Sequence, residues 1–188
     1  MTEKEWIIIL FRDFWISLVN DVPQYIYELL FGLFCIATIL IFVCKGIKGG
    51  WRTVAQVALI EYIVLAYCST LIFRTVNPEI EHHFRPFWSY GVIRANPNSM
   101  ILPETIMNVI AFVPMGVLLG MTIRSIKWWK VLLAGSIMSI SIEVLQFMTK
   151  RGVSEVDDVI HNALGCIIGY GAYLLSVKCI HTMYNEWK

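Results

Sequence analysis

Most of the chemistry-bearing side chains of this chain lie in one short stretch, SISIEVLQFMTKRGVSEVDDVIHN, which spans residues 139–162. It begins with apolar residues and then collects carboxylates, amides, cations and a histidine: Glu143, Gln146, Lys150, Arg151, Glu155, Asp157, Asp158, His161 and Asn162. Carboxylates beside an arginine and amides can bind a phosphate-bearing headgroup, transfer protons or form a structural network. The spacing alone is compatible with all three tasks.

Helical spacing places several of these side chains on shared faces. Glu143 and Gln146 are separated by three positions, and Asp158 and Asn162 by four, so each pair shares one face of a helix. Asp157 and Asp158 fall where a helix begins, and a carboxylate there is favourable by about 0.3–1 kcal/mol. For one of these two residues, a role in capping the helix is as well supported as a role in ligand binding.

Other chemistries lack their signatures. The sequence contains no HExxH motif, no P-loop and no GxSxG elbow. His161 is expected inside a helix bundle more than on a metal, and His82 and His83 beside Glu79 and Glu81 are expected in a solvated loop. We therefore expect no metal and no cofactor. The net charge of +1 gives no argument for nucleic acid as a partner.

The elements that must position these residues are membrane helices. Hydrophobic residues make up 57% of the chain and charged residues only 15%, with a mean hydropathy of +0.66. A span needs about 20 apolar residues. The fold class predicted is all-α, a polytopic helical membrane protein with about five transmembrane helices, at residues 25–44, 53–73, 105–123, 130–148 and 158–180.

The segment EWIIILFRDFWISLVNDV near the N-terminus has too short an apolar run to span, with Arg12 and Asp13 in its middle. It is predicted to be an interfacial amphipathic helix, and no cleaved signal peptide is expected. We divide the chain into residues 1–54, with this helix and the first span, and residues 55–188, a four-helix domain. Residues 74–104, which contain Pro78, Pro86, Pro97 and Pro103, are predicted to be a loop.

Basic residues set the orientation in the membrane. They are concentrated in the short segments KGIKGGW and RSIKWWK, and such segments face the cytoplasm. This predicts a multi-pass protein of the cell membrane with an extracytoplasmic N-terminus and a cytoplasmic C-terminus. The polar ends of the third, fourth and fifth spans, with Asn108 as a third wall, then meet at one extracytoplasmic depth. Gly165, Gly169 and Gly171 are predicted to form a helix-packing seam.

Several ordered blocks resemble the VanZ-like family of bacterial membrane proteins. They are NVIAFVPMGVLLG at 108–120, EVLQF at 143–147, DDVIHNALGCIIGY at 157–170, RPFWSY at 85–90, and Arg74. The resemblance covers about residues 55–178 and implies a helical protein of the bacterial envelope, in a family whose founding member is associated with low-level resistance to the lipoglycopeptide teicoplanin. The family's polar signature falls on Asn108, Pro114, Gly116, Glu143, Gln146, Arg151, Asp158, Asn162 and Gly165.

Three functions remain open at this point. The first is binding of an amphiphilic ligand in a polar outer-leaflet pocket: a lipid headgroup, a lipid-linked cell-wall intermediate or a lipoglycopeptide. The second is an intramembrane enzyme acting on a lipid or lipid-linked phosphate, with Glu143 or Asp158 as acid or base and Arg151 as the phosphate clamp. The third is a purely structural network. The candidate ligand-binding residues are Arg74, Arg85, Trp88, Asn108, Glu143, Gln146, Arg151, Asp157, Asp158 and Asn162. Membrane lipids are the expected partners.

Overall fold

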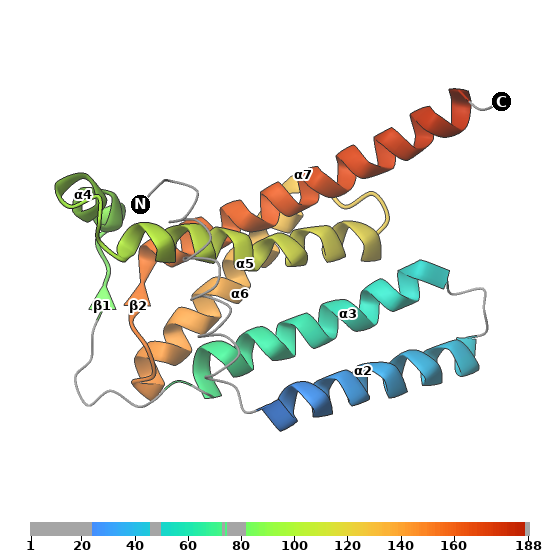
Figure 1. The fold of residues 1–188 in the computed structure, drawn as a ribbon, viewed down its shortest axis with the longest axis horizontal. Coiled ribbons are helices and arrows are strands. Elements are labelled where there is room, and N and C mark those ends of the chain that lie inside the picture. The colour runs from blue at the N-terminus through green and yellow to red at the C-terminus, as the bar shows by residue number, and fades with distance from the viewer. Residues whose placement is uncertain (1–23, 46–49, 73, 75–81, 187–188) are drawn as a thin grey trace.

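The computed structural model of the chain describes residues 24–45, 50–72, 74 and 82–186, and it confirms the all-α class (Figure 1). The elements are α2 (Gln24–Lys45), α3 (Gly50–Tyr67), the π-helix η2 (Cys68–Ile72), β1 (His82–His83), α4 (Trp88–Ala95), α5 (Ile101–Thr122), α6 (Trp128–Thr149), β2 (Ser154–Glu155) and α7 (Val156–Glu186). The predicted amphipathic helix near the N-terminus lies outside the described residues.

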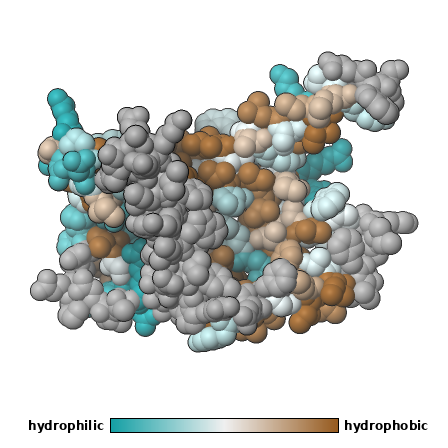
Figure 2. Space-filling view, in the orientation of Figure 1, coloured by the Kyte–Doolittle hydropathy of each residue, from teal (hydrophilic) through white to brown (hydrophobic). Residues whose placement is uncertain are grey.

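Four described helices are long and apolar enough to cross a membrane: Gly50–Leu71, Ile101–Thr122, Trp128–Thr149 and Val156–Asn185. The predicted first span, 25–44, coincides with α2, whose apolar part is Gly32–Ile41. Large apolar side chains are exposed along all these helices, and Figure 2 shows them over the middle of the molecule. Such a surface is stable against lipid tails, with every backbone polar group satisfied inside the helix.

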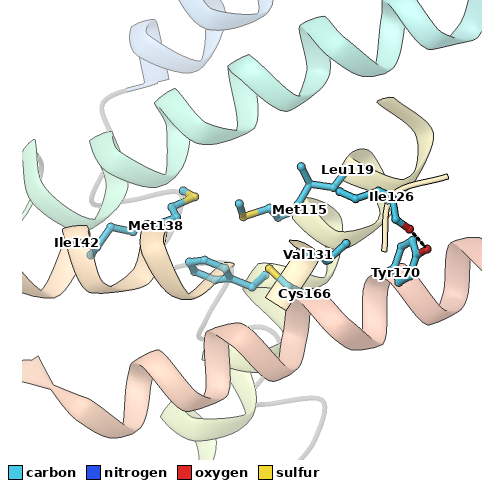
Figure 3. Close-up of a cluster of buried hydrophobic side chains, with 9 residues drawn as sticks. Met115, Leu119, Ile126, Val131, Met138, Ile142, Cys166 and Tyr170 are labelled. Atoms are coloured by element: carbon cyan, nitrogen blue, oxygen red, sulfur yellow. Dashed lines mark hydrogen bonds between the residues drawn. The ribbon is translucent and has the colours of Figure 1, made fainter. Parts of the chain in front are cut away.

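The core lies where α5, α6 and α7 meet. Met115, Met138 and Cys166 converge between the three helices in Figure 3, and all are buried. The Tyr170 hydroxyl, also buried, donates a hydrogen bond to the backbone carbonyl of Ile126 in the turn between α5 and α6. The core thereby fixes α7 to both of its neighbours.

Glycines bring α5 and α7 into backbone contact, side by side in Figure 1. A Cβ added at Gly165 would lie 2.1 Å from the carbonyl oxygen of Val109, and one at Gly169 would lie 2.0 Å from that of Val113. The predicted packing seam is therefore confirmed at these two positions. It is wrong at Gly171, where a Cβ would meet nothing within 4 Å, because this residue lies on a different face of α7.

Pro114 lies inside α5, where it cannot donate the hydrogen bond that the carbonyl of Ile110 would normally accept. One residue farther along, the Tyr62 hydroxyl of α3 donates to the carbonyl of Ala111 at 2.7 Å. A neighbouring helix therefore supplies a donor next to the interruption, as is usual for prolines within membrane helices.

The prediction that residues 74–104 form a loop is wrong in two places. Residues Trp88–Ala95 form α4, and α5 already begins at Ile101, so that Pro103 lies inside it. Proline is tolerated there because the first N–H groups of a helix have no partner within the helix. Proline is therefore a poor indicator of a loop where it occupies the first turn of a helix.

The chain reverses between α6 and α7 in a tight turn. Lys150 adopts a left-handed conformation with φ of 56°, and Gly152 has φ of 89°. The turn leads into β2, which pairs in parallel with β1, placing His82 opposite Ser154 and His83 opposite Glu155. The segment before α4 is therefore attached to the start of α7.

Candidate functional site

The polar residues predicted from the fourth and fifth spans do meet at one end of the bundle. The C-terminal end of α6 and the N-terminal ends of α5 and α7 lie together beside α4, β1 and β2 in Figure 1. Asn108 of α5 donates a hydrogen bond to the Asp158 carboxylate of α7 at 2.6 Å, which joins these two helices. Asn162 of α7 donates to the Ser139 hydroxyl of α6 at 2.8 Å. Polar contacts thus connect all three helices.

A cavity of about 220 Å³ opens beside this network, between α6, β2 and the start of α7. The surface of its walls is almost entirely apolar, although two of the surrounding residues are glutamates; the lining residues are Phe84, Ile140, Glu143, Val144, Phe147, Ser154, Glu155, Val156 and Val159. Glu143 is buried at 7% exposure, and its Oε2 accepts a hydrogen bond of 2.7 Å from the backbone N–H of Glu155. The cavity itself is therefore apolar and lies next to the polar network.

Glu155 is the ionisable cavity residue that lies outside the membrane-spanning segments. Burial raises its pKa to about 7, and the negative charges of Asp158, Glu104 and Asp157 act in the same direction. The nearby Trp88 indole N–H lowers the pKa of Glu155 and so partly offsets this rise. The N–H does not meet the geometry of a formed hydrogen bond. The Glu155 carboxyl group is accordingly poised to change its charge near neutral pH.

Arginine and amide side chains tie the site to the end of α3. Gln146 Nε2 donates to the carbonyl of Thr70, and Arg151 Nη1 donates to that of Leu71, each at 3.2 Å. Both acceptors belong to the π-helix. Arg74, just beyond it, is exposed and interacts electrostatically with both Glu143 and Asp158. Arg74 therefore acts on both carboxylates considered as acid or base.

Asp157 has a different position from its neighbour Asp158. Its carboxylate accepts hydrogen bonds from the backbone N–H of Phe87 at 2.5 Å, from that of Ser89 at 3.0 Å and from the Ser89 hydroxyl at 2.5 Å. Phe87 has φ of 62°, an unusual conformation for a phenylalanine, which this contact helps to hold. Asp157 thus caps α4, a helix far from it in sequence, and does not line the described cavity.

The remaining candidates lie around α4 and the cavity. Arg85 is exposed in the bend before α4, and Trp88 is half-buried and stacks on His83 with ring centroids 3.8 Å apart. His161 is buried, its Nε2 lying 3.0 Å from the Tyr90 hydroxyl. In the part of the chain that the structure describes, no group of three or more His, Cys, Asp or Glu side chains has a metal-binding arrangement.

Sequence reasoning did not name Glu155, Phe147 and Ser89 as candidate site residues, although all three lie in the stretches that it singled out. Glu155 stands in the polar stretch, but it follows no helical spacing with Glu143 because a turn separates them. Ser89 is the second residue of α4, and its pairing with Asp157 depends on the long connection folding back. For Phe147, the one sequence signal was that a large apolar residue directly follows the candidate Gln146.

Comparisons with known proteins show similarity to one family of membrane proteins. A profile described as VanZ/LLP1 matches residues 34–177, which is most of the chain and includes the cavity and the polar network. Protein VanZ of Enterococcus faecium is 35% identical over 75 residues, which are 40% of this chain and 47% of that protein. The aligned part thus spans about half the length of that relative. No solved structure matches the chain.

Proposed function

Because the chain belongs to the VanZ-like family of membrane proteins, we propose that it binds an amphiphilic ligand of the bacterial envelope at the polar end of its helix bundle. The observation that carries this proposal is the cavity of about 220 Å³ with apolar walls, which opens next to the polar network of α5, α6 and α7. An apolar cavity beside polar groups suits a molecule with an apolar part and a polar group.

The place of the cavity supports the same proposal. Its walls come from the last turns of α6 and the first turn of α7, where two membrane-spanning helices end. Phe84, which directly follows β1, and Phe147 of α6 line this edge of the cavity. Their rings are tilted relative to each other, with centroids 5.8 Å apart. A lipid headgroup, a lipid-linked cell-wall intermediate or a lipoglycopeptide would all present their polar parts at such a depth.

The test compares two substitutions of the same kind on α7. Val159→Phe fills the cavity, whereas Ile168→Phe changes an exposed residue on the membrane-facing surface. Both variants are purified in mild detergent, and the lipids that remain bound are identified by mass spectrometry. We expect Ile168→Phe to retain the amphiphile bound to the parent chain and Val159→Phe to lose it. Equal retention in both variants would contradict the proposal.

The lipoglycopeptide version has its own measurement. Susceptibility to teicoplanin is compared with and without expression of the chain, using vancomycin, which lacks the acyl chain, as the control antibiotic. A rise in tolerance to teicoplanin alone supports this version, and unchanged values for both antibiotics remove it.

An intramembrane enzyme is the second candidate, favoured by the interaction of Arg74 with both Glu143 and Asp158. These groups would supply an acid, a base and a phosphate-binding cation, a role that Arg74 fits in addition to Arg151. A new lipid species in expressing cells, lost in Glu143→Gln and Asp158→Asn variants that are inserted normally, would establish catalysis. An unchanged lipid profile would reject it.

A further inference from the structure

A second cavity, of about 260 Å³, lies at the other end of the bundle, between the turn that joins α5 to α6 and the second half of α7. It shares no lining residue with the first cavity. Its walls include Ile123, Arg124 and Ser125 from the turn and Tyr173, Leu174 and Val177 from α7.

The packing of α7 fixes the two sides of this second cavity relative to each other. The Tyr170 hydroxyl donates a hydrogen bond to the carbonyl of Ile126 (Figure 3). The ring of Tyr173 covers Gly120, where an added Cβ would lie 2.4 Å from its Cδ1 atom. Beyond these contacts, α7 continues past the end of α5 in Figure 1. The cavity is therefore formed where α7 leaves the bundle.

Polar atoms form a substantial part of the wall of the second cavity, in contrast to the first. Arg124 is the charged residue of this wall, and its side chain is exposed. Within the described part of the chain it makes no hydrogen bond or ion pair. A guanidinium group carries five N–H donors and a permanent positive charge. Its donors are therefore available to an anion.

The charges around the second cavity are mostly positive. Arg52 of α3 reaches the end of α5, where its Nε donates a hydrogen bond of 2.7 Å to the carbonyl of Thr122, next to Ile123. The charged side chains that the described residues bring to this end are Arg52, Arg124, Lys127, Lys130, Lys178 and Glu186. Glu186 lies in the last turn of α7, beyond the cavity, and Glu61 lies in the middle of α3. An anion at Arg124 would therefore be attracted.

The surroundings of the second cavity suit a lipid more than a soluble anion. Trp128 and Trp129, at the start of α6, are exposed, and tryptophan is enriched at the level of the lipid headgroups. Ile123, Leu174 and Val177 add exposed apolar surface to the cavity wall. A molecule with a phosphate at Arg124 could therefore place acyl chains along these three side chains.

We infer that the second cavity binds the headgroup of an anionic phospholipid, with the phosphate held by the Arg124 guanidinium. The two N–H donors of a guanidinium fork match two phosphate oxygens. Basic pockets between membrane helices are suited to anionic headgroups for the same reason. This site differs from the cavity of the proposed function in position, lining and charge, and it does not depend on that function.

Native mass spectrometry of the full chain in detergent tests the inference with phosphatidylglycerol and phosphatidylcholine of the same acyl chains. Both lipids contain a phosphate, but phosphatidylcholine adds a quaternary ammonium group that the surrounding cations repel. We expect the first phosphatidylglycerol to bind at least about tenfold more tightly than the first phosphatidylcholine. Equal binding would overturn the inference. So would displacement of phosphatidylglycerol by an equal concentration of glycerol phosphate, which has no acyl chains.

Three substitutions of arginine or lysine by glutamine locate the phosphate. Arg124→Gln should remove most of the preference for phosphatidylglycerol. Lys127→Gln, in the same turn but outside the cavity lining, and Arg94→Gln, in α4 at the other end, should keep it. All three side chains are exposed, so these variants should fold alike. An unchanged preference in Arg124→Gln, or an equal loss in Lys127→Gln, would show that Arg124 is not the phosphate ligand and overturn the inference.

A pair of substitutions on α7 tests the cavity itself. Val177→Phe fills the second cavity, whereas Ile180→Phe changes an exposed residue outside its lining. Binding of phosphatidylglycerol should fall only in Val177→Phe, and equal binding in both variants would contradict the site. Val159→Phe, which fills the first cavity, should leave this binding unchanged. A preference lost in Val159→Phe would place the anionic lipid in the first cavity, so the two proposals can fail separately.

Discussion

At the residue scale, carboxylates at the polar end of the bundle have distinct tasks. Asp157 holds α4 through three hydrogen bonds, Asp158 joins α7 to α5 through Asn108, and Glu143 joins the end of α6 to the backbone of Glu155. Burying a charge is expensive unless it is well satisfied. Asp157, whose carboxylate accepts three hydrogen bonds, is therefore a structural group.

We predict that Asp157→Asn destabilises the protein by about 2–3 kcal/mol, because hydrogen bonds from backbone N–H groups to a buried carboxylate are strong and the amide presents an NH₂ group to one of these donors. Glu104→Gln, an exposed acid in the first turn of α5, is the control and should have little effect. Thermal unfolding in detergent measures both. An Asp157→Asn variant as stable as the parent would show that α4 does not depend on this contact.

At the element scale, the site exists because α5 and α7 approach until their backbones touch. Gly165 and Gly169 of α7 lie against carbonyl oxygens of α5, and Gly116 of α5 lies against the carbonyl of Cys166. Close packing of small residues is a main source of association between helices in lipid, where no hydrophobic effect drives it. This approach places Asn108 within reach of Asp158.

We predict that Gly169→Ala and Gly165→Ala each destabilise the chain by about 1–3 kcal/mol or more, since the new methyl group collides with a backbone carbonyl that cannot rotate away. Gly171→Ala is the matched control on the same helix, where a Cβ has open space and alanine is the better helix former. The midpoint of thermal unfolding in detergent should fall only for the first two variants. Equal midpoints for all three would contradict the seam.

At the scale of the whole molecule, the two ends of the helix bundle differ in the elements and charges that they carry. One end carries α4, β1, β2 and the cavity, and the other carries the basic turn between α5 and α6 with Arg124 and Lys127. Figure 2 shows hydrophilic residues at the α4 end and apolar ones between the ends. The positive-inside rule predicts that this basic turn faces the cytoplasm, and the cavity would then lie at the extracytoplasmic end.

We predict from this asymmetry that Asn98→Cys, in the exposed turn between α4 and α5, reacts with a membrane-impermeant maleimide in intact cells. Lys127→Cys, just before α6, should react only after the cells are permeabilised. Labelling is measured relative to the parent chain, which contains native cysteines. The reverse pattern would invert the orientation and place the cavity at the cytoplasmic face.

The sequence by itself determined the membrane helices, because a long apolar run has one stable arrangement in a bilayer, with its backbone bonds satisfied inside a helix. It also determined that Glu143, Asp158 and Asn108 come to one end, because helices that cross the membrane in alternate directions bring alternate ends together. The glycine spacing on α7 was readable for the same reason, although Gly171 was not part of the contact.

Only the tertiary structure decided which partner each polar group has. Asp157 and Asp158 are identical in type and adjacent in sequence, but they point in different directions from α7, one to Ser89 and the other to Asn108. These contacts join positions 68 and 50 residues apart. Local periodicity describes the faces of one helix and contains no information on which distant segment covers a face. The folding of β1 and α4 onto the start of α7 supplies that information, and with it Glu155 and the cavity.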